Sequence, residues 1–493
     1  MRRKLKKVIC SVVVGVCILA ESSMCTFAEE PYETYNFNYW GEAVVQPHSY
    51  QYHDTISVIA DGKSLSFPED MCLFENTLYV ADTGNSRILK LDMKGNVEMI
   101  IDCAMNETDK LKEPQGIFIT EEGRLYVADS GNGRIVEYDE AGRWVRTIGR
   151  PETNLLDESK EYKPLKVVVD HSGRIYATAY GINMGLVEFD RNGVFQGFMG
   201  AAKVSVSPLE YIWKNYFSTE AQQARMETII PTEYSNIFVD DENFIYATIS
   251  NLTDEELMSG ADAIRRLNPT GTDVLRRLSN YWIVGDVGEH VVQCSSFCDV
   301  AATDYGCYFV LDNANGKVFA YDYDGNSLFA FGKKGIKEGN VQKPSAIALG
   351  ENEGQIYILD HVLGSILVFD VTEYGRHLLD AIRLNDSGDS EGANSEWQEV
   401  LTCNSNNELA YIGLGKTYLA EGDNKKAMEY FKLGNSRKYY TKAFFYHRKE
   451  VMEANFSKSM LGLGILLIVI VGIRYSIKFR RWVGEVRCYM SKR

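Results

Sequence analysis

Short apolar runs recur through the middle of the chain and are separated by turns rich in Gly and Asn. Each run begins with an aromatic residue, and these residues lie 47, 50, 70, 63 and 48 residues apart. Four runs end in aspartate, whereas the third and fourth are degenerate copies. The six runs are Tyr79–Asp82, Tyr126–Asp129, Tyr176–Ala179, Tyr246–Ile249, Phe309–Asp312 and Tyr357–Asp360. Short strands with this period predict an array of similar sheets.

A turn follows several of the runs and predicts a β-hairpin in each unit. Gly84–Ile88 and Gly131–Ile135 both combine Gly and Asn with a basic and an apolar residue. Gly and Asn accept the positive φ that tight hairpin turns need. A unit of roughly 45 residues with such strands corresponds to one four-stranded blade. Six copies therefore predict a mainly β protein with a closed six-bladed β-propeller.

The predicted propeller covers residues 55–384. Its closure needs a strand from the far end of the chain, and Thr55–Ile59 is the candidate for the outer strand of the last blade. Residues 29–54 form an aromatic-rich N-terminal extension that we expect to pack on the propeller. A helical insertion is predicted at 208–227, and a polar, acidic segment at 253–263. Long loops on a rigid scaffold often carry binding, although the helical insertion could equally serve packing alone.

The two best copies, Tyr79–Ile88 and Tyr126–Ile135, resemble NHL repeats. The resemblance covers about residues 55–384 and implies an NHL-type β-propeller. The Asp, Asn and Arg residues of the repeat are interpreted as structural, because they cap turns and bond adjacent strands. The whole chain resembles bacterial exported NHL-repeat proteins with a tetratricopeptide-like segment and a C-terminal anchor. That resemblance implies an architecture more than an activity.

Helical periodicity replaces the strand pattern after a polar linker predicted at 385–394. The following segment, 395–455, contains small and aromatic residues that fit one tetratricopeptide helix–turn–helix unit. These residues are Leu414, Gly415, Tyr418, Ala427 and Phe431. Such repeats need neighbours to bury their faces. The segment is therefore interpreted either as a peptide-binding unit or as a helical stalk that holds the propeller away from a bilayer.

Apolar runs near the two ends predict export and membrane anchoring. Residues 1–28 have a basic start, a short apolar run and a small residue at the end, which is typical of a secretory signal peptide; an uncleaved anchor is the alternative. Residues 456–477 are predicted to form a transmembrane helix, with a buried core helix as the alternative. The basic tail at 478–493 is expected in the cytoplasm. These features predict a single-pass protein of the cell membrane whose body lies outside the cytoplasm.

Charge is distributed according to these predicted compartments. The net charge is −16, and the two basic ends carry +4 (residues 1–28) and +6 (residues 474–493), so the body carries −26. A body this acidic repels anionic polymers, which argues against a nucleic-acid partner. It could attract cations or basic partners, but solubility alone is a sufficient explanation.

Ten cysteines and seven histidines supply the candidates for chemistry. His361 is the one histidine expected at the mouth of the propeller channel, whereas His171, in a turn, is expected to point away from it. No histidine pair has metal-ligand spacing, and neither a nucleophile elbow nor a phosphate loop is present. Six cysteines in the body have no spacing typical of a disulfide framework or zinc site. They are Cys72, Cys103, Cys294, Cys298, Cys307 and Cys403. The sequence predicts no catalytic, metal-binding or cofactor-binding residue and no cofactor, and it assigns no ligand-binding residue.

Three functions are compatible with this architecture. We expect a non-catalytic, membrane-anchored scaffold that engages a protein partner in a membrane complex through propeller loops and the helical segment. One alternative is a receptor for a carbohydrate or peptide that uses an aromatic-rich face of the propeller. The other is a metal-dependent lactonase or lyase, because six-bladed propellers include such enzymes.

Overall fold

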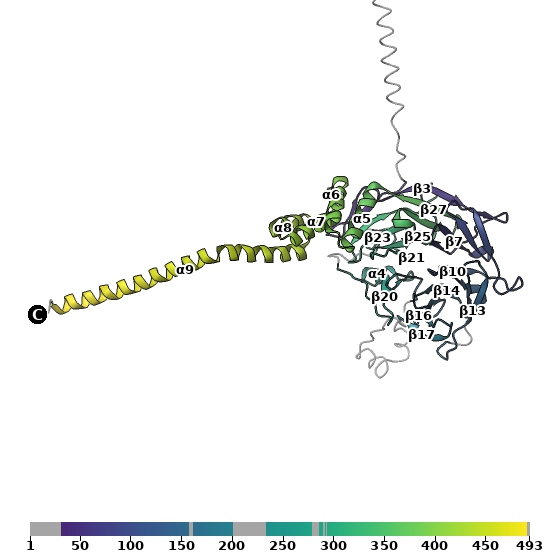
Figure 1. Ribbon diagram of the computed structural model, residues 1–493, viewed down its shortest axis with the longest axis horizontal. Coiled ribbons are helices and arrows are strands. Elements are labelled where there is room, and N and C mark those ends of the chain that lie inside the picture. The colour runs from purple at the N-terminus through teal and green to yellow at the C-terminus, as the bar shows by residue number, and fades with distance from the viewer. Residues whose placement is uncertain are drawn as a thin grey trace, which may run out of the picture. The chain divides into compact units, whose positions relative to one another are not determined.

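The computed structural model describes residues 31–156, 161–200, 233–278, 285–288, 291 and 293–490. The predicted signal peptide (1–28) and helical insertion (208–227) lie outside these residues. The chain divides into two compact units, residues 1–376 and 377–493. The first unit contains the strands and the second contains helices (Figure 1).

Six sheets, formed in chain order, make up the first unit and confirm the predicted six-bladed β-propeller. Within each sheet, neighbouring strands are antiparallel. The fourth blade has three strands among the described residues, and the others have at least four. Blade 1 contains β6 (Asp70–Phe74), β7 (Thr77–Asp82), β8 (Arg87–Asp92) and β9 (Val97–Ile101); blade 2 contains β10 (Pro114–Ile119), β11 (Leu125–Asp129), β12 (Arg134–Tyr138) and β13 (Trp144–Ile148); blade 3 contains β14 (Pro164–Val169), β15 (Ile175–Ala179), β16 (Leu186–Phe189) and β17 (Phe195–Met199). Blade 4 contains β18 (Asn236–Val239), β19 (Ile245–Thr248) and β20 (Ile264–Leu267); blade 5 contains β21 (Phe297–Ala302), β22 (Tyr308–Asp312), β23 (Lys317–Tyr321) and β24 (Ser327–Phe331); blade 6 contains β25 (Pro344–Leu349), β26 (Gln355–Asp360) and β27 (Ser365–Val371).

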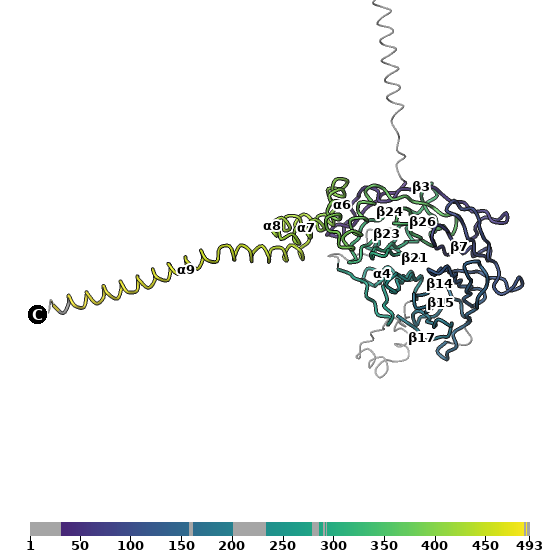
Figure 2. Tube along the Cα trace, viewed as in Figure 1, coloured from purple at the N-terminus to yellow at the C-terminus, as the bar shows by residue number. Residues whose placement is uncertain are grey.

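The ring is closed by a strand from the start of the described chain. Strand β3 (Tyr50–Ser57) pairs with β27 as the outer strand of blade 6. Figure 2 shows this purple segment running beside the green trace of the last blade. The predicted closing segment, Thr55–Ile59, is thus partly right, because β3 begins earlier and ends at Ser57. The short strands β1 (Tyr35–Phe37) and β2 (Ala43–Val45) extend blade 5 by pairing β1 with β24, and a small hairpin forms from β4 (Ile59–Ala60) and β5 (Lys63–Ser64).

The aspartate that ends each well-formed repeat is a fully buried structural residue. Asp82 accepts hydrogen bonds from the Ser66 amide at 2.8 Å and from Arg87 Nε at 2.7 Å. Asp129 makes the equivalent bonds to the Lys112 amide and to Arg134 Nε, at 2.8 and 2.7 Å. Each carboxylate therefore joins the turn of its own blade to the segment that precedes the blade. This agrees with the structural role expected from the repeat.

The acidic segment predicted inside blade 4 forms a short helix between β19 and β20. Helix α4 (Asp254–Met258) begins with a capping box, in which the Thr253 side chain accepts from the Glu256 amide and the Glu256 carboxylate accepts from the Thr253 amide. Reciprocal bonds of this kind satisfy amides that a helix start leaves unpaired.

The chain becomes helical directly after the last strand of the propeller. The last strand, β27, ends at Val371, and α5 (Glu373–Asp386) follows, so the strands do not reach residue 384. The predicted linker, 385–394, is largely helical because α6 starts at Ser390. Its polar residues include the helix cap: Asp389 accepts from the Gly392 amide at 2.9 Å.

Helices continue to the end of the described chain. After α6 (Ser390–Cys403) come α7 (Glu408–Glu421), α8 (Asn424–Leu433) and α9 (Arg437–Met490). Helices α7 and α8 form an antiparallel pair, because Gly434, after α8, lies close to Glu408 and Ile412 at the start of α7. Gly415 allows close packing, since a Cβ atom there would lie 2.6 Å from the Phe431 ring.

Helix α9 contains the predicted transmembrane segment, 456–477. Its length and composition would allow it to cross a membrane, and its most apolar part is exposed. By these two criteria, it is the one candidate for a membrane span among the described residues.

Candidate functional site

The inner strands of the six blades surround a cavity of about 830 Å³. All six of these strands, β6, β10, β14, β18, β21 and β25, contribute lining residues. Pockets of this size hold small molecules in many proteins. The cavity is therefore the candidate functional site of the propeller.

Equivalent positions, one from each inner strand, form a ring beside this cavity, and the four polar ones line it. The equivalence follows from the pairing register, because each position pairs with the third residue of the repeated aromatic run. Four positions are polar and two are small. In chain order, the ring residues are Asp70, Gly116, Lys166, Asn236, Asp299 and Ala346. We call this set the channel ring.

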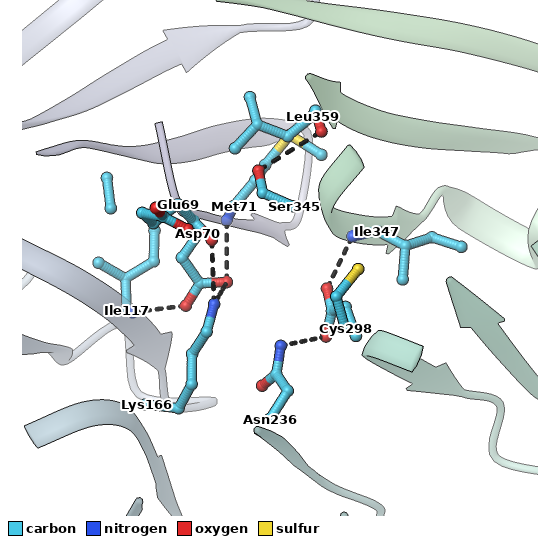
Figure 3. A network of polar contacts seen from close by, with 12 residues as sticks. Glu69, Asp70, Met71, Ile117, Lys166, Asn236, Cys298, Ser345, Ile347 and Leu359 are labelled. Carbon is cyan, nitrogen blue, oxygen red and sulfur yellow. Dashed lines mark hydrogen bonds and ion pairs between the residues drawn. The ribbon is translucent and has the colours of Figure 1, made fainter. Parts of the chain in front are cut away.

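Asp70 and Lys166 form a buried ion pair across blades 1 and 3. The Lys166 ammonium lies 2.8 Å from Asp70 Oδ1, and the two side chains are 11% and 10% exposed. Lys166 also donates to the Glu69 carbonyl, and the Ile117 amide donates to Asp70 Oδ2 at 2.8 Å (Figure 3). Burial disfavours the ammonium, but the nearby carboxylates of Asp70 and Asp299 outweigh burial and hold the pKa of Lys166 above its usual value.

Asp299 is the second carboxylate of the ring, and its partners are neutral. Asn236 Nδ2 donates to Oδ1 at 2.6 Å, and the Ile347 amide donates to Oδ2 at 2.7 Å. Figure 3 shows these two donors converging beside Cys298. Burial raises the pKa of Asp299 to about 7, an effect that the charge of Lys166 opposes and that of Asp70 reinforces. Near neutral pH, this carboxyl group therefore exchanges a proton inside the cavity.

Each of the two small ring residues precedes a backbone amide that binds a ring carboxylate. Each aspartate reaches the backbone amide that follows the small ring residue of the next blade: Ile117 follows Gly116, and Ile347 follows Ala346. A Cβ atom at Gly116 would lie 2.4 Å from the Leu165 carbonyl, so that position admits only glycine. The same carboxylate–amide arrangement thus occurs twice in the ring.

The turns after the inner strands add charged residues to the cavity. His171, expected to point away from the channel, is among the residues that line the cavity. Its Nε2 atom lies 3.3 Å from Glu121, which lines the cavity too. His361, expected at the mouth, does not line the cavity; its Nδ1 atom lies 3.2 Å from Glu69, the neighbour of Asp70.

None of the six predicted exported cysteines, which all lie in the described part of the chain, forms a disulfide. Cys72 lines the cavity, and Cys298 precedes a ring residue. Burial raises the pKa of both thiols well above the usual value, so both stay protonated. In the described ranges, no group of three or more His, Cys, Asp and Glu side chains is arranged to hold a metal ion.

Sequence reasoning assigned no residue of the channel ring. The ring residues carry no motif of their own, because blades contribute Asp, Gly, Lys, Asn or Ala at one structural position. A usable signal was nevertheless present: each lies 11 to 13 residues before its partner in the repeated run. Aligning the six units on that run would have gathered the four polar residues.

Two stretches of the chain match known families. Residues 54–156 match the family described as the SMP-30/Gluconolactonase/LRE-like region, and residues 293–389 match a family described as a 6-bladed beta-propeller. No curated protein matches the chain. These matches support the six-bladed propeller fold.

Solved structures of similar shape are distant in sequence. A streptogramin B lyase is 10% identical with a TM-score of 0.41, covering 65% of this chain and 97% of its own. A virginiamycin B lyase from Staphylococcus aureus is 10% identical with a TM-score of 0.39, covering 62% and 95%. A protein of unknown function from Bacteroides thetaiotaomicron is 13% identical with a TM-score of 0.41, covering 70% and 77%. At such values, the likeness carries no argument about activity.

Proposed function

We propose that this protein is a membrane-anchored receptor, located outside the cytoplasm, whose propeller channel binds a carbohydrate. The observation that carries the proposal is the channel ring, which places buried hydrogen-bond donors and acceptors side by side in a cavity of about 830 Å³. In this proposal, α9 anchors the protein in the cell membrane, with the basic tail in the cytoplasm.

The chemistry of the ring suits hydroxyl groups. A hydroxyl both donates and accepts, whereas a carboxylate only accepts and an ammonium only donates. Neighbouring sugar hydroxyls can therefore bind Asp299 and Asn236 on one side and Lys166 with Asp70 on the other. Phe118 and Phe238 line the same cavity and offer apolar surface to the carbon face of a sugar ring.

The test is thermal unfolding of the full-length protein in detergent with a panel of neutral mono- and oligosaccharides. We expect at least one sugar to raise the melting temperature, because a ligand at 100 times its Kd stabilises the folded state by about 2.7 kcal/mol. Asn236→Ala should abolish that rise, whereas the exposed Asn192→Ala should keep it. A flat response across the panel, or a rise that survives Asn236→Ala, would contradict the proposal.

A second candidate function is the scaffold role, in which the protein engages a protein partner. It is favoured by an aromatic cluster on helices α7 and α8, and we propose that these two helices form a tetratricopeptide-like unit. The ring centres of Tyr418 and Tyr430 lie 5.0 Å apart, and those of Tyr411 and Tyr430 lie 6.3 Å apart. Lys426 Nζ lies 3.9 Å from the Tyr418 ring centre. The three tyrosines are only partly buried, so they offer aromatic surface to a peptide.

Affinity purification from crosslinked native membranes tests the scaffold role. We expect a protein partner in stoichiometric amount, lost in Tyr430→Ser and kept in the neighbouring, exposed Glu429→Ala. Recovery of the protein without a partner would count against the scaffold role and leave the receptor proposal untouched.

A further inference from the structure

We propose that the part of α9 before the membrane forms a parallel coiled coil with the same helix of a second copy of this chain. We call the face through which the two helices would meet the seam. The seam consists of Phe445, Arg448, Lys449, Met452, Glu453 and Phe456, which line one shallow groove on the helix. The parallel orientation rests on the proposed membrane anchor, because two chains that enter the same membrane in the same sense hold their helices parallel.

The seam lies on the side of α9 that its own unit leaves open. Ala443 is buried in a cluster with Ala427 and Phe431 of α8, and Asn424 of α8 bonds Glu450. At 100° per residue, Met452 lies on the opposite side of the helix from Ala443. The exposed fractions are 53% for Phe445, 62% for Met452 and 62% for Phe456. Large apolar residues that are this exposed and share one face mark an interaction surface.

The spacing of the seam is that of a heptad repeat. Phe445 and Met452 occupy d positions, and Lys449 and Phe456 occupy a positions. The next d position is Ser459, and beyond it the same register continues through the predicted membrane span with further exposed apolar residues at a and d. These are Leu463, Leu466, Ile470 and Ile473. A single charged residue at an a position, here Lys449, is a known device that fixes register at a cost in stability.

Charge complementarity indicates that the helix packing against the seam belongs to a second copy of this chain. In this register Arg448 is a g residue and Glu453 is the e residue five positions later, which is the pair that meets between parallel chains. Within one chain these two residues form no ion pair with each other; Glu453 lies 3.8 Å from Lys449 instead. Two copies would therefore form two Arg448–Glu453 pairs, one on each side of the seam.

Lipid does not account for the first part of the seam. Phe445 lies 11 residues before the predicted span at 456–477, which is about 16 Å along a helix axis. Acyl chains do not reach a side chain at that height, so Phe445 needs another apolar cover.

Cysteine crosslinking of the full-length protein in nanodiscs tests the proposal. In a background with Cys403→Ser and Cys488→Ser, we expect Met452→Cys to give a disulfide-linked dimer, because d residues of the two chains face each other. Val451→Cys, which is similarly exposed at 46% but lies off the seam, should give severalfold less dimer. Equal crosslinking of the two variants, or crosslinking of neither, would overturn the proposal.

Charge exchange provides an independent test. Arg448→Glu alone and Glu453→Arg alone should each lower dimer formation severalfold, since each places like charges opposite one another. The double variant Arg448→Glu/Glu453→Arg should restore it. If the double variant forms no more dimer than the single variants, the Arg448–Glu453 pairing is overturned. If the purified wild-type chain is monomeric in nanodiscs, the dimer itself is overturned.

Discussion

Replacing Lys166 with methionine should produce a large loss of stability. The substitution leaves the buried Asp70 carboxylate with hydrogen bonds to backbone amides but no cation. Breaking a buried ion pair from one side costs about 3–5 kcal/mol of unfolding free energy. Because Lys166 lowers the pKa of Asp299, its removal should also move that titration above its value of about 7. Denaturant unfolding of the full-length protein at several pH values measures both effects.

Two matched variants distinguish a buried pair from a general effect of losing a lysine. Lys110→Met removes an ion pair with Asp102 whose side chains are 54% and 48% exposed, and it should change stability little. The neutral pair Asp70→Asn/Lys166→Met should recover much of the stability lost by Lys166→Met alone. If Lys166→Met is as mild as Lys110→Met, the ion pair does not stabilise the channel.

Replacing Asp299 with asparagine should change how stability depends on pH. The folded-state pKa of about 7 is above the ordinary aspartate value of 3.8, so the folded protein holds a proton that the unfolded chain has released. The stabilisation from Asp299 is thus complete at low pH and is lost as the pH rises to about 7. From pH 5 to pH 8 the wild-type unfolding free energy should fall by about 3 kcal/mol through this group.

The Asp299→Asn variant lacks the titrating carboxyl group. The difference in unfolding free energy between the wild type and this variant should therefore change by the same amount, about 3 kcal/mol, between pH 5 and pH 8. Asp92→Asn is the control, because Asp92 lies partly exposed at the end of β8 and its pKa is lowered by bonds to Asn96. Parallel pH profiles for the wild type and Asp299→Asn would show that this carboxyl group has no raised pKa in the folded protein.

The sequence allowed the blades to be predicted because four of the six repeat the same requirement. In these four, the second strand ends in a residue that ties the turn to the preceding segment, and aspartate at 82, 129, 312 and 360 does so. The channel ring has no such shared requirement, since its positions differ from blade to blade in the charge and the size of the residue that fits. Asp299 depends on Asn236 and on an amide of blade 6, so its partners become visible only when the ring is closed.

The errors after the propeller have a physical origin as well. Residues 385–394 are polar, and polar clusters with glycine indicate loops as readily as helix caps. The structure resolves this choice in favour of a cap, because Asp389 accepts from the Gly392 amide and α6 buries Ala393, Trp397 and Val400. The position of α5 was missed because the helix begins two residues after the last strand ends. Its buried apolar residues, including Leu378 and Leu379, therefore continue the apolar pattern of the propeller without a break.

The closing strand has a consequence for the order of events during synthesis. Strand β3 leaves the ribosome before β6, the first strand of blade 1, but its partner, β27, is more than 300 residues later in the chain. Until residue 371 has emerged, the edge of β3 has no partner, and bringing the two ends together carries the entropy cost of a very long loop. Blades 1 to 5 can therefore form one after another, while the channel and its buried charges are completed only when β3 meets β27.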